Sequence, residues 1–364
     1  MKEIAETLAA WRRDGVRFAL ATVVATWKSA PRQPGAAMAV AETGEVVGSV
    51  SGGCVEGALY EVAIEVLTSG RPRLAHYGVS DDDAFGVGLT CGGMLDVLVV
   101  PVDDQAYPEF AEVVTAVLGG EPVAVATVTG GVPEIGGHLV VTGTGVTGTL
   151  GHERRDAAVA ELARGMLASG RTGVVHTGLE GRRREDDLSV FVQSFTPPPR
   201  MLVFGAIDFA AAVTRIGKFL GYHVILCDAR PVFATRKRFP EADDVVVDWP
   251  HRFLPKAEVD ERTVICVLTH DPKFDVPLLK LAVRTPARYI GVMGSRRTHE
   301  DRTARLRAEG VTEAELARLS SPIGLDLCAR TPEETAVAIA AEIIALTWGG
   351  TGVRLSTTTT AIHR

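Results

Sequence analysis

The stretch MLVFGAIDFAAAV, residues 201–213, predicts a buried strand, a tight turn at Gly205 and then a helix. From about residue 200 to 348, further apolar runs alternate with segments of helical periodicity, joined by short polar connections. Strands that are apolar on both faces and separated by helices are typical of a parallel sheet covered on each side. We therefore predict an α/β protein whose C-terminal half is a Rossmann-like, doubly wound parallel sheet.

The turn at Gly205 matches a dinucleotide fingerprint only in part. In such a site the first glycine makes the tight turn, and the second lets the pyrophosphate approach the backbone. A small residue at the third position lets the helix pack closely on the strand. An acid about 20 residues further on binds the ribose hydroxyls. Gly205, Ala210 and Asp228 fit this pattern. Ile207 does not, because a β-branched side chain stands where the phosphate would rest. A nucleotide site adapted to another ligand and an inherited fold without a nucleotide both stay open, so NAD(P) binding is doubtful.

A second candidate site lies at the carboxyl ends of the later strands, where open α/β sheets bind ligands. His270 ends one predicted strand, and Gly294, Ser295, Arg296 and Arg297 end the next strand and begin a helix. Backbone amides at a helix start, a serine and two arginines favour an anion such as a phosphate. The alternative is a hydrogen-bonded histidine and a solvated pair of arginines.

The N-terminal half has a different order of predicted helices and strands. The sequence of residues 1–196 predicts a mixed α/β domain in which a first amphipathic helix leads into several strands. Three consecutive prolines, 197–199, are extended and stiff, and they mark the boundary to the Rossmann-like domain of residues 200–350. Residues 351–364 have no periodicity and are expected to form a flexible tail. We find no internal repeat in the sequence.

Composition limits the partners of the chain. Its 364 residues carry a net charge of −7, which offers no field to attract nucleic acid. The N-terminus lacks the layout of a signal peptide, and no uncharged apolar run approaches the roughly 20 residues of a membrane span. Five scattered cysteines without a CxxC spacing predict neither a disulfide framework nor a zinc or iron–sulfur site. We expect a cytoplasmic protein with no nucleic acid partner and no membrane span.

Two cysteines stand beside paired glycines. In SGGCVEG, Cys54 follows Gly52 and Gly53 at the start of a predicted helix, and in TCGG, Cys91 lies in a glycine-rich loop. An approachable thiol at the positive end of a helix suits a nucleophile or a soft-metal ligand. A buried thiol in a structural turn is the alternative, and it stays open for Cys91. Glu56 is a candidate acid–base partner of Cys54, or a residue that compensates the helix dipole.

Five segments together resemble the xanthine dehydrogenase accessory factor (XdhC/CoxI) family. The resemblance reaches both halves of the chain, and it is carried by the order and spacing of the set rather than by any one motif. The segments are GSVSGGCVEGAL (48–59), LTCGG (89–93), VLTHDPKFDVPLL (267–279), YIGVMGSRRTHEDR (289–302) and SPIGLDLCARTPEETAVAIAAEI (321–343).

The resemblance implies an accessory protein rather than a stand-alone enzyme. Such proteins bind the molybdenum cofactor (molybdopterin), assist its maturation and deliver it to a xanthine dehydrogenase-type molybdenum hydroxylase, in some cases with a cysteine desulfurase as a further partner. The family's GGC cysteine corresponds to Cys54, a possible molybdenum ligand, in a cleft expected between the two domains. The pterin phosphate would suit the helix start at Ser295–Arg297. The chain departs from the family at Ile207 and Asp208, so nothing assigned to the glycine and histidine usual there carries over.

Three other functions are considered. An NAD(P)-dependent oxidoreductase would bind its cofactor in the Rossmann-like domain. A non-catalytic assembly protein would bind a partner enzyme without binding the cofactor. A xanthine dehydrogenase itself is excluded by composition, because the chain lacks a cysteine set for the iron–sulfur clusters that such an enzyme needs. The apolar last helix with Trp348 could form a homodimer contact or cap the sheet.

Overall fold

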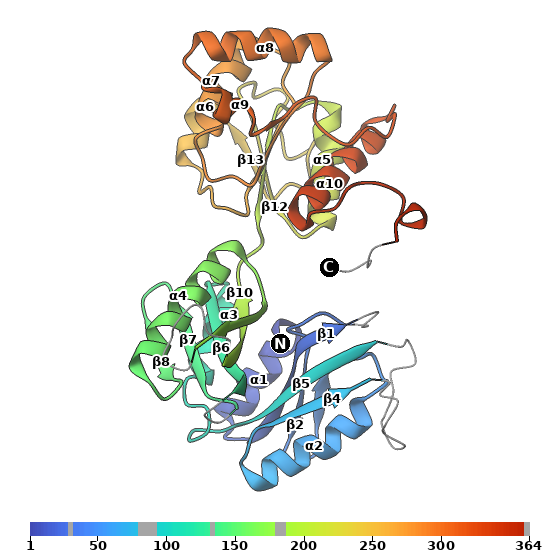
Figure 1. The fold of residues 1–364 in the computed structure, drawn as a ribbon. Coiled ribbons are helices and arrows are strands. Elements are labelled where there is room, and N and C mark those ends of the chain that lie inside the picture. Colours follow the sequence, from blue (N-terminus) through green and yellow to red (C-terminus); the bar gives the residue numbers. More distant parts are fainter. Residues whose placement is uncertain (28–31, 79–92, 132–134, 179–186, 360–364) are drawn as a thin grey trace. The chain divides into compact units, whose positions relative to one another are not determined.

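The computed structural model describes residues 1–27, 32–78, 93–131, 135–178 and 187–359. Contacts between Cα atoms divide them into two units, Met1–Pro197 and Pro198–Thr359 (Figure 1), and each unit is described by itself. In the described ranges, no helix is long and apolar enough to cross a membrane.

The C-terminal unit contains one six-stranded sheet in the order β13-β12-β11-β14-β15-β16, with every neighbouring pair parallel. Its strands are β11 (Arg200–Phe204), β12 (His223–Asp228), β13 (Asp244–Val247), β14 (Val264–Val267), β15 (Tyr289–Val292) and β16 (Leu319–Ser320). Its helices are α5 (Asp208–Phe219), α6 (Pro250–Phe253), η2 (Leu254–Lys256), α7 (Pro272–Ala282), α8 (Arg296–Ala308), α9 (Glu313–Leu316), α10 (Pro332–Trp348) and η3 (Leu355–Thr357). The predicted Rossmann-like doubly wound parallel sheet is confirmed.

Helices cover both faces of this sheet, which explains its fully apolar strands. In β11, Met201 and Val203 pack in a cluster with side chains of α5 and α10. Leu202 and Phe204 alternate with them and pack on the opposite face with side chains of α7 and α8. β11 therefore buries side chains on both faces of the sheet, and Figure 1 shows α5 and α10 on one side of the sheet and α7 and α8 on the other.

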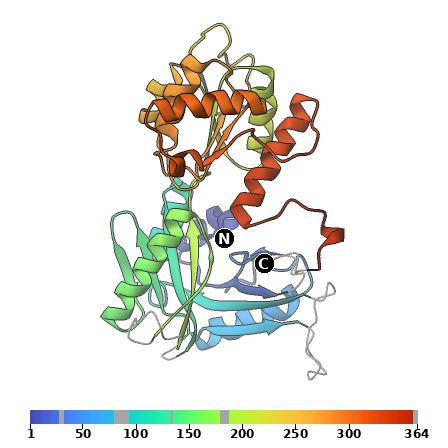
Figure 2. The same cartoon turned by 45° about the horizontal axis from the view of Figure 1, so that its top comes forward.

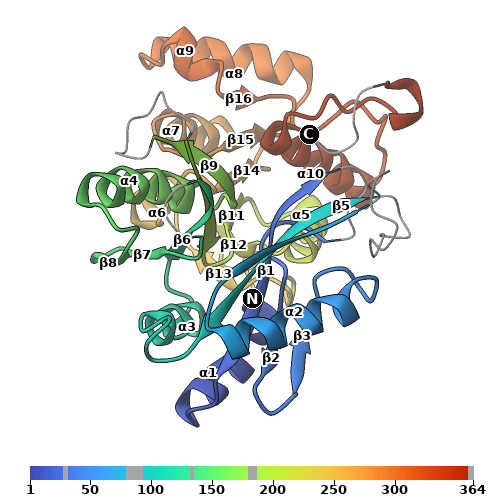
Figure 3. The ribbon, with the colours of Figure 1, turned by 60° about the horizontal axis from the view of Figure 1, so that its bottom comes forward.

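The N-terminal unit contains two five-stranded antiparallel sheets, in the orders β3-β2-β1-β5-β4 and β8-β7-β6-β10-β9. The first half consists of η1 (Lys2–Ile4), α1 (Ala5–Arg13), β1 (Phe18–Trp27), β2 (Ala37–Ala41), β3 (Val46–Gly48), α2 (Glu56–Ser69), β4 (Arg73–Tyr77) and β5 (Met94–Val102). The second consists of α3 (Phe110–Gly119), β6 (Val123–Gly131), β7 (His138–Thr142), β8 (Val146–Thr149), α4 (Glu153–Ser169), β9 (Gly173–Thr177) and β10 (Leu188–Phe195). Figures 2 and 3 show α2 on the first sheet and α4 on the second.

The two halves of this unit are copies of one fold, so the expectation of no internal repeat is wrong. Both run helix, three strands, helix, two strands, and each strand of one half has the same place in its sheet as its counterpart in the other. The sequences keep a faint trace of this relation, since LTSGRPRLAHYG (67–78) aligns with LASGRTGVVHTG (167–178). His76 of β4 is the cross-strand partner of Asp96 in β5. At the equivalent position of the second half, His176 of β9 is the cross-strand partner of Ser189 in β10. The shared residues are too sparse to reveal the repeat without the topology.

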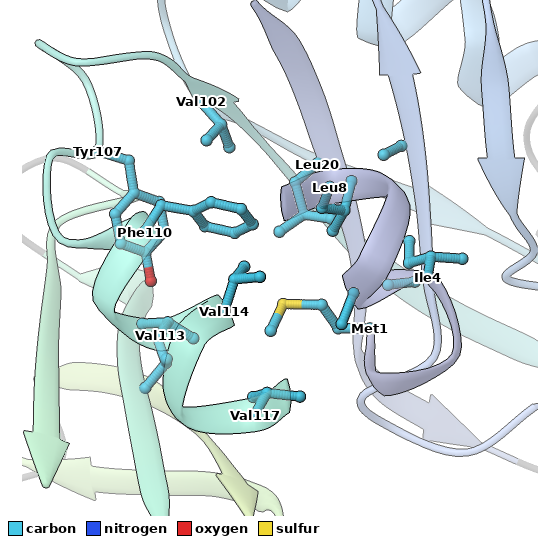
Figure 4. Close-up of a cluster of buried hydrophobic side chains, with 14 of the residues drawn as sticks. Met1, Ile4, Leu8, Leu20, Val102, Tyr107, Phe110, Val113, Val114 and Val117 are labelled. Atoms are coloured by element: carbon cyan, nitrogen blue, oxygen red, sulfur yellow. The ribbon is translucent and has the colours of Figure 1, made fainter. Parts of the chain in front are cut away.

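The equivalent helices α1 and α3 meet in a shared core. Figure 4 shows Met1, which precedes η1, and Leu8 of α1 on one side, with Phe110 and Val114 of α3 on the other. Phe110 also packs edge-to-face on Phe18 of β1, with ring centroids 5.4 Å apart. This apolar contact joins the two halves into one unit.

Candidate functional site

The loop that carries Cys54 lies between β3 and α2 and folds around one carboxylate. Glu56, the first residue of α2, accepts hydrogen bonds from the backbone N–H groups of Ser51, Gly52 and Gly53 at 2.9, 3.1 and 2.8 Å. It also accepts the hydroxyl groups of Ser49 and Ser51 at 2.6 and 2.5 Å. Most of the loop's donors thus converge on a single side chain.

These contacts define what Glu56 can do. Burial by itself would raise the pKa of the Glu56 carboxyl, but the hydrogen bonds from Ser49 and Ser51 outweigh it and hold that pKa well below the usual range. The carboxylate is therefore ionised and saturated with donors. Its geometry supports a positioning role, and the expected acid–base role stays a prediction.

Cys54 sits at the open side of this loop. Its backbone N–H donates to the Ser51 hydroxyl at 2.9 Å, and its half-buried side chain packs against the cluster that contains Val55. Gly52 and Gly53 have φ of 77° and 116°, a region that favours glycine, and no atom lies within 4 Å of a Cβ built on either. The paired glycines give the loop its shape and leave space beside the backbone.

The connection between β8 and α4 in the second half of the unit is shorter and has no cysteine, but it is also organised by an acid. Asp156, in the first turn of α4, accepts the Thr149 hydroxyl and the Leu150 backbone N–H, both at 2.7 Å. In the order of the repeat, Thr149 corresponds to Ser49 and Asp156 to Glu56, whereas Arg154, which has the sequence position equivalent to Cys54, lies inside α4. The fold therefore needs the acid in this loop, whereas the cysteine is particular to the first copy.

A matched pair of variants tests this interpretation. Glu56→Gln is expected to lower the free energy of unfolding by about 2 kcal/mol, because an amide cannot accept so many donors and lacks the charge. The pKa of Glu56 is lowered in the folded chain, so its contribution is complete above the ordinary glutamate pKa of 4.5 and is lost as pH falls below it. Urea unfolding between about pH 3 and pH 7 measures this difference, which should be constant at neutral pH and shrink in acid. Asp156→Asn removes a carboxylate that accepts fewer hydrogen bonds and should cost less, and equal costs would contradict the proposed positioning role.

Cys54 is the only cysteine of the N-terminal unit that the structure describes. Cys91 lies outside the described residues. Cys227 and Cys266 are buried in the C-terminal unit, and burial raises the pKa of each thiol to about 12, which makes them unreactive. Cys328 is exposed.

The turn at Gly205 has the backbone shape of a Rossmann turn, but Asp228, the acid that would bind a ribose, already accepts hydrogen bonds from Arg230. Gly205 has φ of 107°, and a Cβ there would lie 3.0 Å from the Thr269 side chain. Asp228, only 3% exposed, accepts the Ala206 N–H at 2.7 Å and two side-chain N–H groups of Arg230 at 2.9 and 2.7 Å. A ribose would have to displace this arginine, so the geometry gives a dinucleotide no support.

Ile207 has an ordinary role in the same turn. Its backbone is extended at the N-cap of α5, and its half-buried side chain packs against the cluster that includes Ile339 and Ile343 of α10. It fills the junction between the two helices, which a glycine at that position would leave open.

The expected anion site at the start of α8 has the predicted groups. Ser295 is the N-cap residue, and its hydroxyl oxygen accepts the Thr298 N–H at 3.1 Å. Arg296 and Arg297 are exposed in the first turn, and neither has an ion-pair partner among the residues that the structure describes. His270 follows β14 and is exposed. The two arginines are available to an anion, while Ser295 mainly caps the helix.

Sequence reasoning missed a buried ion pair beneath these loops. Arg302 of α8, 4% exposed, donates to the Asp275 carboxylate at 3.0 Å and to the Met293 carbonyl at 2.9 Å. Asp275 of α7 also accepts the Thr269 hydroxyl. Burial raises the pKa of Asp275, and Thr269 and Arg302 act against that rise. The pair thereby fixes the loops that follow β14 and β15, and nothing in the sequence distinguishes Arg302 from the other arginines of α8.

No group of three or more histidine, cysteine, aspartate or glutamate side chains that could hold a metal ion occurs within the described ranges. The Cys54 thiol is a soft donor of the kind that a sulfur-preferring metal accepts.

Two family models match the sequence. The XdhC Rossmann domain matches residues 201–343, and the XdhC and CoxI family matches residues 11–78 and 116–178. The described Rossmann sheet and the Cys54 loop thus both fall inside matched segments.

Three known proteins are similar along nearly the whole chain. A protein of Bacillus subtilis named as a probable xanthine dehydrogenase subunit is 27% identical over 333 residues, which cover 91% of this chain and 93% of that protein. "Molybdenum cofactor insertion chaperone PaoD" of Escherichia coli is 26% identical over 330 residues, 91% of this chain and 83% of that protein. A solved structure described as a xanthine dehydrogenase from Bacillus halodurans is 27% identical, with a TM-score of 0.65 and coverage of 98% of both chains.

Proposed function

The chain belongs to the XdhC and CoxI family, and from that premise we propose that it binds the molybdenum cofactor and inserts it into a xanthine dehydrogenase-type molybdenum hydroxylase. The observation that carries the proposal is the similarity, across both units, to a molybdenum cofactor insertion chaperone. The relative and the solved structure whose names mention xanthine dehydrogenase support that enzyme class as the partner.

The residues of the Cys54 loop fit such a cofactor. A thiolate is a soft ligand suited to a metal that prefers sulfur, and Gly52 and Gly53 leave open space beside it. Glu56 holds the loop through the N–H groups of Ser51 and Gly53, so the thiol needs little rearrangement to bind. When bound, the cofactor would supply the metal and its sulfur chemistry, while these residues orient and retain it. Cys91 stays a proposal as a second thiol.

The phosphate of the pterin would be held in the C-terminal unit. Arg296 and Arg297 are exposed at the N-terminus of α8, beside Gly294 and Ser295, and they offer two positive charges without internal partners in the described part of the chain. His270 could add a donor from the end of β14. Among the other predicted cofactor-binding residues, Gly205 and Asp228 shape the turn rather than offer a vacant donor or acceptor.

We also propose two partners besides the hydroxylase, a cysteine desulfurase and a second copy of this chain. A cysteine desulfurase would supply the sulfur for cofactor maturation, and a homodimer would use the apolar face of α10. The cytoplasmic location predicted from the sequence stays a prediction. Mixing the purified chain with a purified desulfurase and measuring sulfur transfer to bound cofactor tests the first of these.

Co-expression with the cofactor biosynthesis proteins tests the proposed function. The purified chain should then contain molybdenum and pterin in about equal amounts, and it should activate a cofactor-free xanthine dehydrogenase-type enzyme when the two are mixed. By itself it should not oxidise xanthine, because its cysteines form no iron–sulfur cluster motif. A chain that carries no pterin and activates no partner would contradict the proposal.

A further inference from the structure

Helix α10 has a second apolar face in addition to the one that it buries. Ile339 and Ile343 are buried in the cluster that contains side chains of β11 and α5. On another side of the same helix, Val337, Ile344 and Trp348 are 51%, 44% and 77% exposed. Single exposed apolar residues are common on protein surfaces, but a row of them along one helix is typical of an interaction surface.

The spacing of these residues indicates which kind of partner fits. Val337, Ala341, Ile344 and Trp348 are separated by four, three and four positions, and we call them the α10 stripe. At about 100° per residue they lie within about 60° of one another around the helix axis. Apolar residues at alternating intervals of three and four are the contact that one helix offers to another in a coiled coil. The α10 stripe therefore fits a helix rather than a strand.

The α10 stripe is complementary to a copy of itself. Its intervals read the same in both directions, so its four positions are symmetric about the midpoint between residues 342 and 343. In an antiparallel pair of α10 helices, Ala341 of one copy therefore faces Ile344 of the other, and Val337 faces Trp348. Each of these pairs combines a smaller side chain with a larger one, which lets the facing layers interdigitate.

A pocket lies at the end of the stripe that the second copy's tryptophan would reach. It has a volume of about 440 Å³, and its lining includes Val337 of α10 and residues 327–330 of the segment before the helix. Leu327 in this lining is 51% exposed. Trp348 is 11 positions beyond Val337, which is about 16.5 Å along the helix. One end of the stripe is thus an apolar pocket, and the other end is a protruding ring.

The acids beside this pocket already have partners within their own unit. Glu333 is paired with Arg215 at 3.0 Å, and Glu334 accepts the backbone N–H groups of Arg330 and Thr331 at 2.7 and 3.1 Å. A ring that covers the pocket therefore leaves neither carboxylate without a partner. The same acids disfavour an anionic membrane as the partner, because helices that lie on such membranes carry basic residues beside their apolar face.

We infer that α10 packs antiparallel against α10 of a second copy of this chain, with the Trp348 ring of each copy seated in the pocket beside Val337 of the other. The inference rests on the homodimer of the proposed function and deepens it, because it assigns the contacts. Reciprocal insertion closes the assembly at two copies, since each copy uses its ring and its pocket once. A large aromatic side chain in a pocket of this kind dominates the binding energy of an interface.

Sedimentation of the full chain tests the assigned contacts. The wild-type chain should be a dimer at micromolar concentration. Trp348→Ala should raise the dissociation constant of the dimer about thirty-fold or more, because it removes the ring and leaves the pocket unfilled. Ile344→Glu should abolish the dimer, because it places a charge in the centre of an apolar contact.

Leu346 supplies a matched control on the same helix. It is 59% exposed, but it is two positions from Ile344 and therefore lies on the opposite side of α10. Leu346→Ala and Leu346→Glu repeat the two substitutions away from the stripe and should leave the dissociation constant unchanged. A dimer that Leu346→Glu weakens as much as Ile344→Glu does would contradict the assignment of the stripe.

The thiol of Cys328 reports on the pocket independently. Cys328 is exposed and belongs to the lining of the pocket. In the dimer, Trp348 of the second copy covers this lining. Alkylation of Cys328, followed by mass spectrometry of its peptide, should therefore slow as the protein concentration rises. Trp348→Ala should remove this dependence on concentration.

Two results would overturn the inference. One is a wild-type chain that stays monomeric at micromolar concentration, and the other is a dimer in which Cys328 reacts as fast as it does in the monomer. A monomer that binds vesicles of anionic lipid through Ile344 would assign the stripe to a membrane instead. The proposed cofactor function fails on a different result, a purified chain without molybdenum or pterin after co-expression, so the two failures are distinguishable.

Discussion

The Cys54→Ala variant is expected to retain less than about a tenth of the molybdenum and pterin that the wild-type chain carries after co-expression. The thiol is the only soft donor at its loop in the described part of the chain, and alanine keeps the backbone N–H that Cys54 donates to the Ser51 hydroxyl. The variant should therefore fold normally and lose only the ligand. Metal analysis and pterin fluorescence of the purified protein measure this directly.

A second cysteine supplies the control for that experiment. Cys328 is exposed in the C-terminal unit, so Cys328→Ala also removes one accessible thiol. It should retain the cofactor at the wild-type level. Full retention by Cys54→Ala would remove Cys54 from the site and leave Cys91 as the remaining candidate thiol.

The Asp275→Asn variant is expected to lower the free energy of unfolding of the C-terminal unit by about 3–5 kcal/mol. Asp275 and Arg302 are each about 4% exposed, and asparagine would leave the guanidinium buried without a counter-charge. The loops after β14 and β15 should loosen together, because Arg302 also donates to the Met293 carbonyl. Urea unfolding gives the free energy, and hydrogen exchange locates the loosened segments.

Two further variants show whether the cost of Asp275→Asn comes from leaving a buried charge unpaired. Glu313→Gln breaks the exposed pair with Arg307 and should lower the free energy of unfolding far less than Asp275→Asn does, because solvent screens an exposed pair. The double variant Asp275→Leu/Arg302→Met removes both buried charges and should recover most of the lost stability. If Asp275→Asn costs no more than Glu313→Gln, the pair does not organise these loops.

Local patterns were sufficient for the C-terminal fold. The strand, turn and helix at residues 201–213 and the alternation after them predicted the parallel sheet, because apolar runs that bury both faces leave a direct trace in sequence. The start of α10 at Thr331 depends on a short-range pattern of the same kind, because its capping box joins residues only three positions apart.

The repeat of the N-terminal unit was not predictable in this way. Its two halves share strand order and the acid that organises one loop, Glu56 in the first and Asp156 in the second, but few identical residues. A sheet requires apolar residues at its buried positions, but many different apolar residues can fill each position. Two copies can therefore diverge in sequence while keeping the same topology.

The sequence by itself determined the doubly wound sheet, the family and the residues that could bind a cofactor, since all of these lie in contiguous motifs such as the one around Cys54. Only the tertiary structure decided what those residues contact. Asp228 is taken by Arg230, Glu56 holds a loop, and Arg302 reaches Asp275 across 27 residues. Such contacts depend on which strands lie side by side in the folded sheet, and strand order is set by the packing of the whole unit rather than by any local pattern.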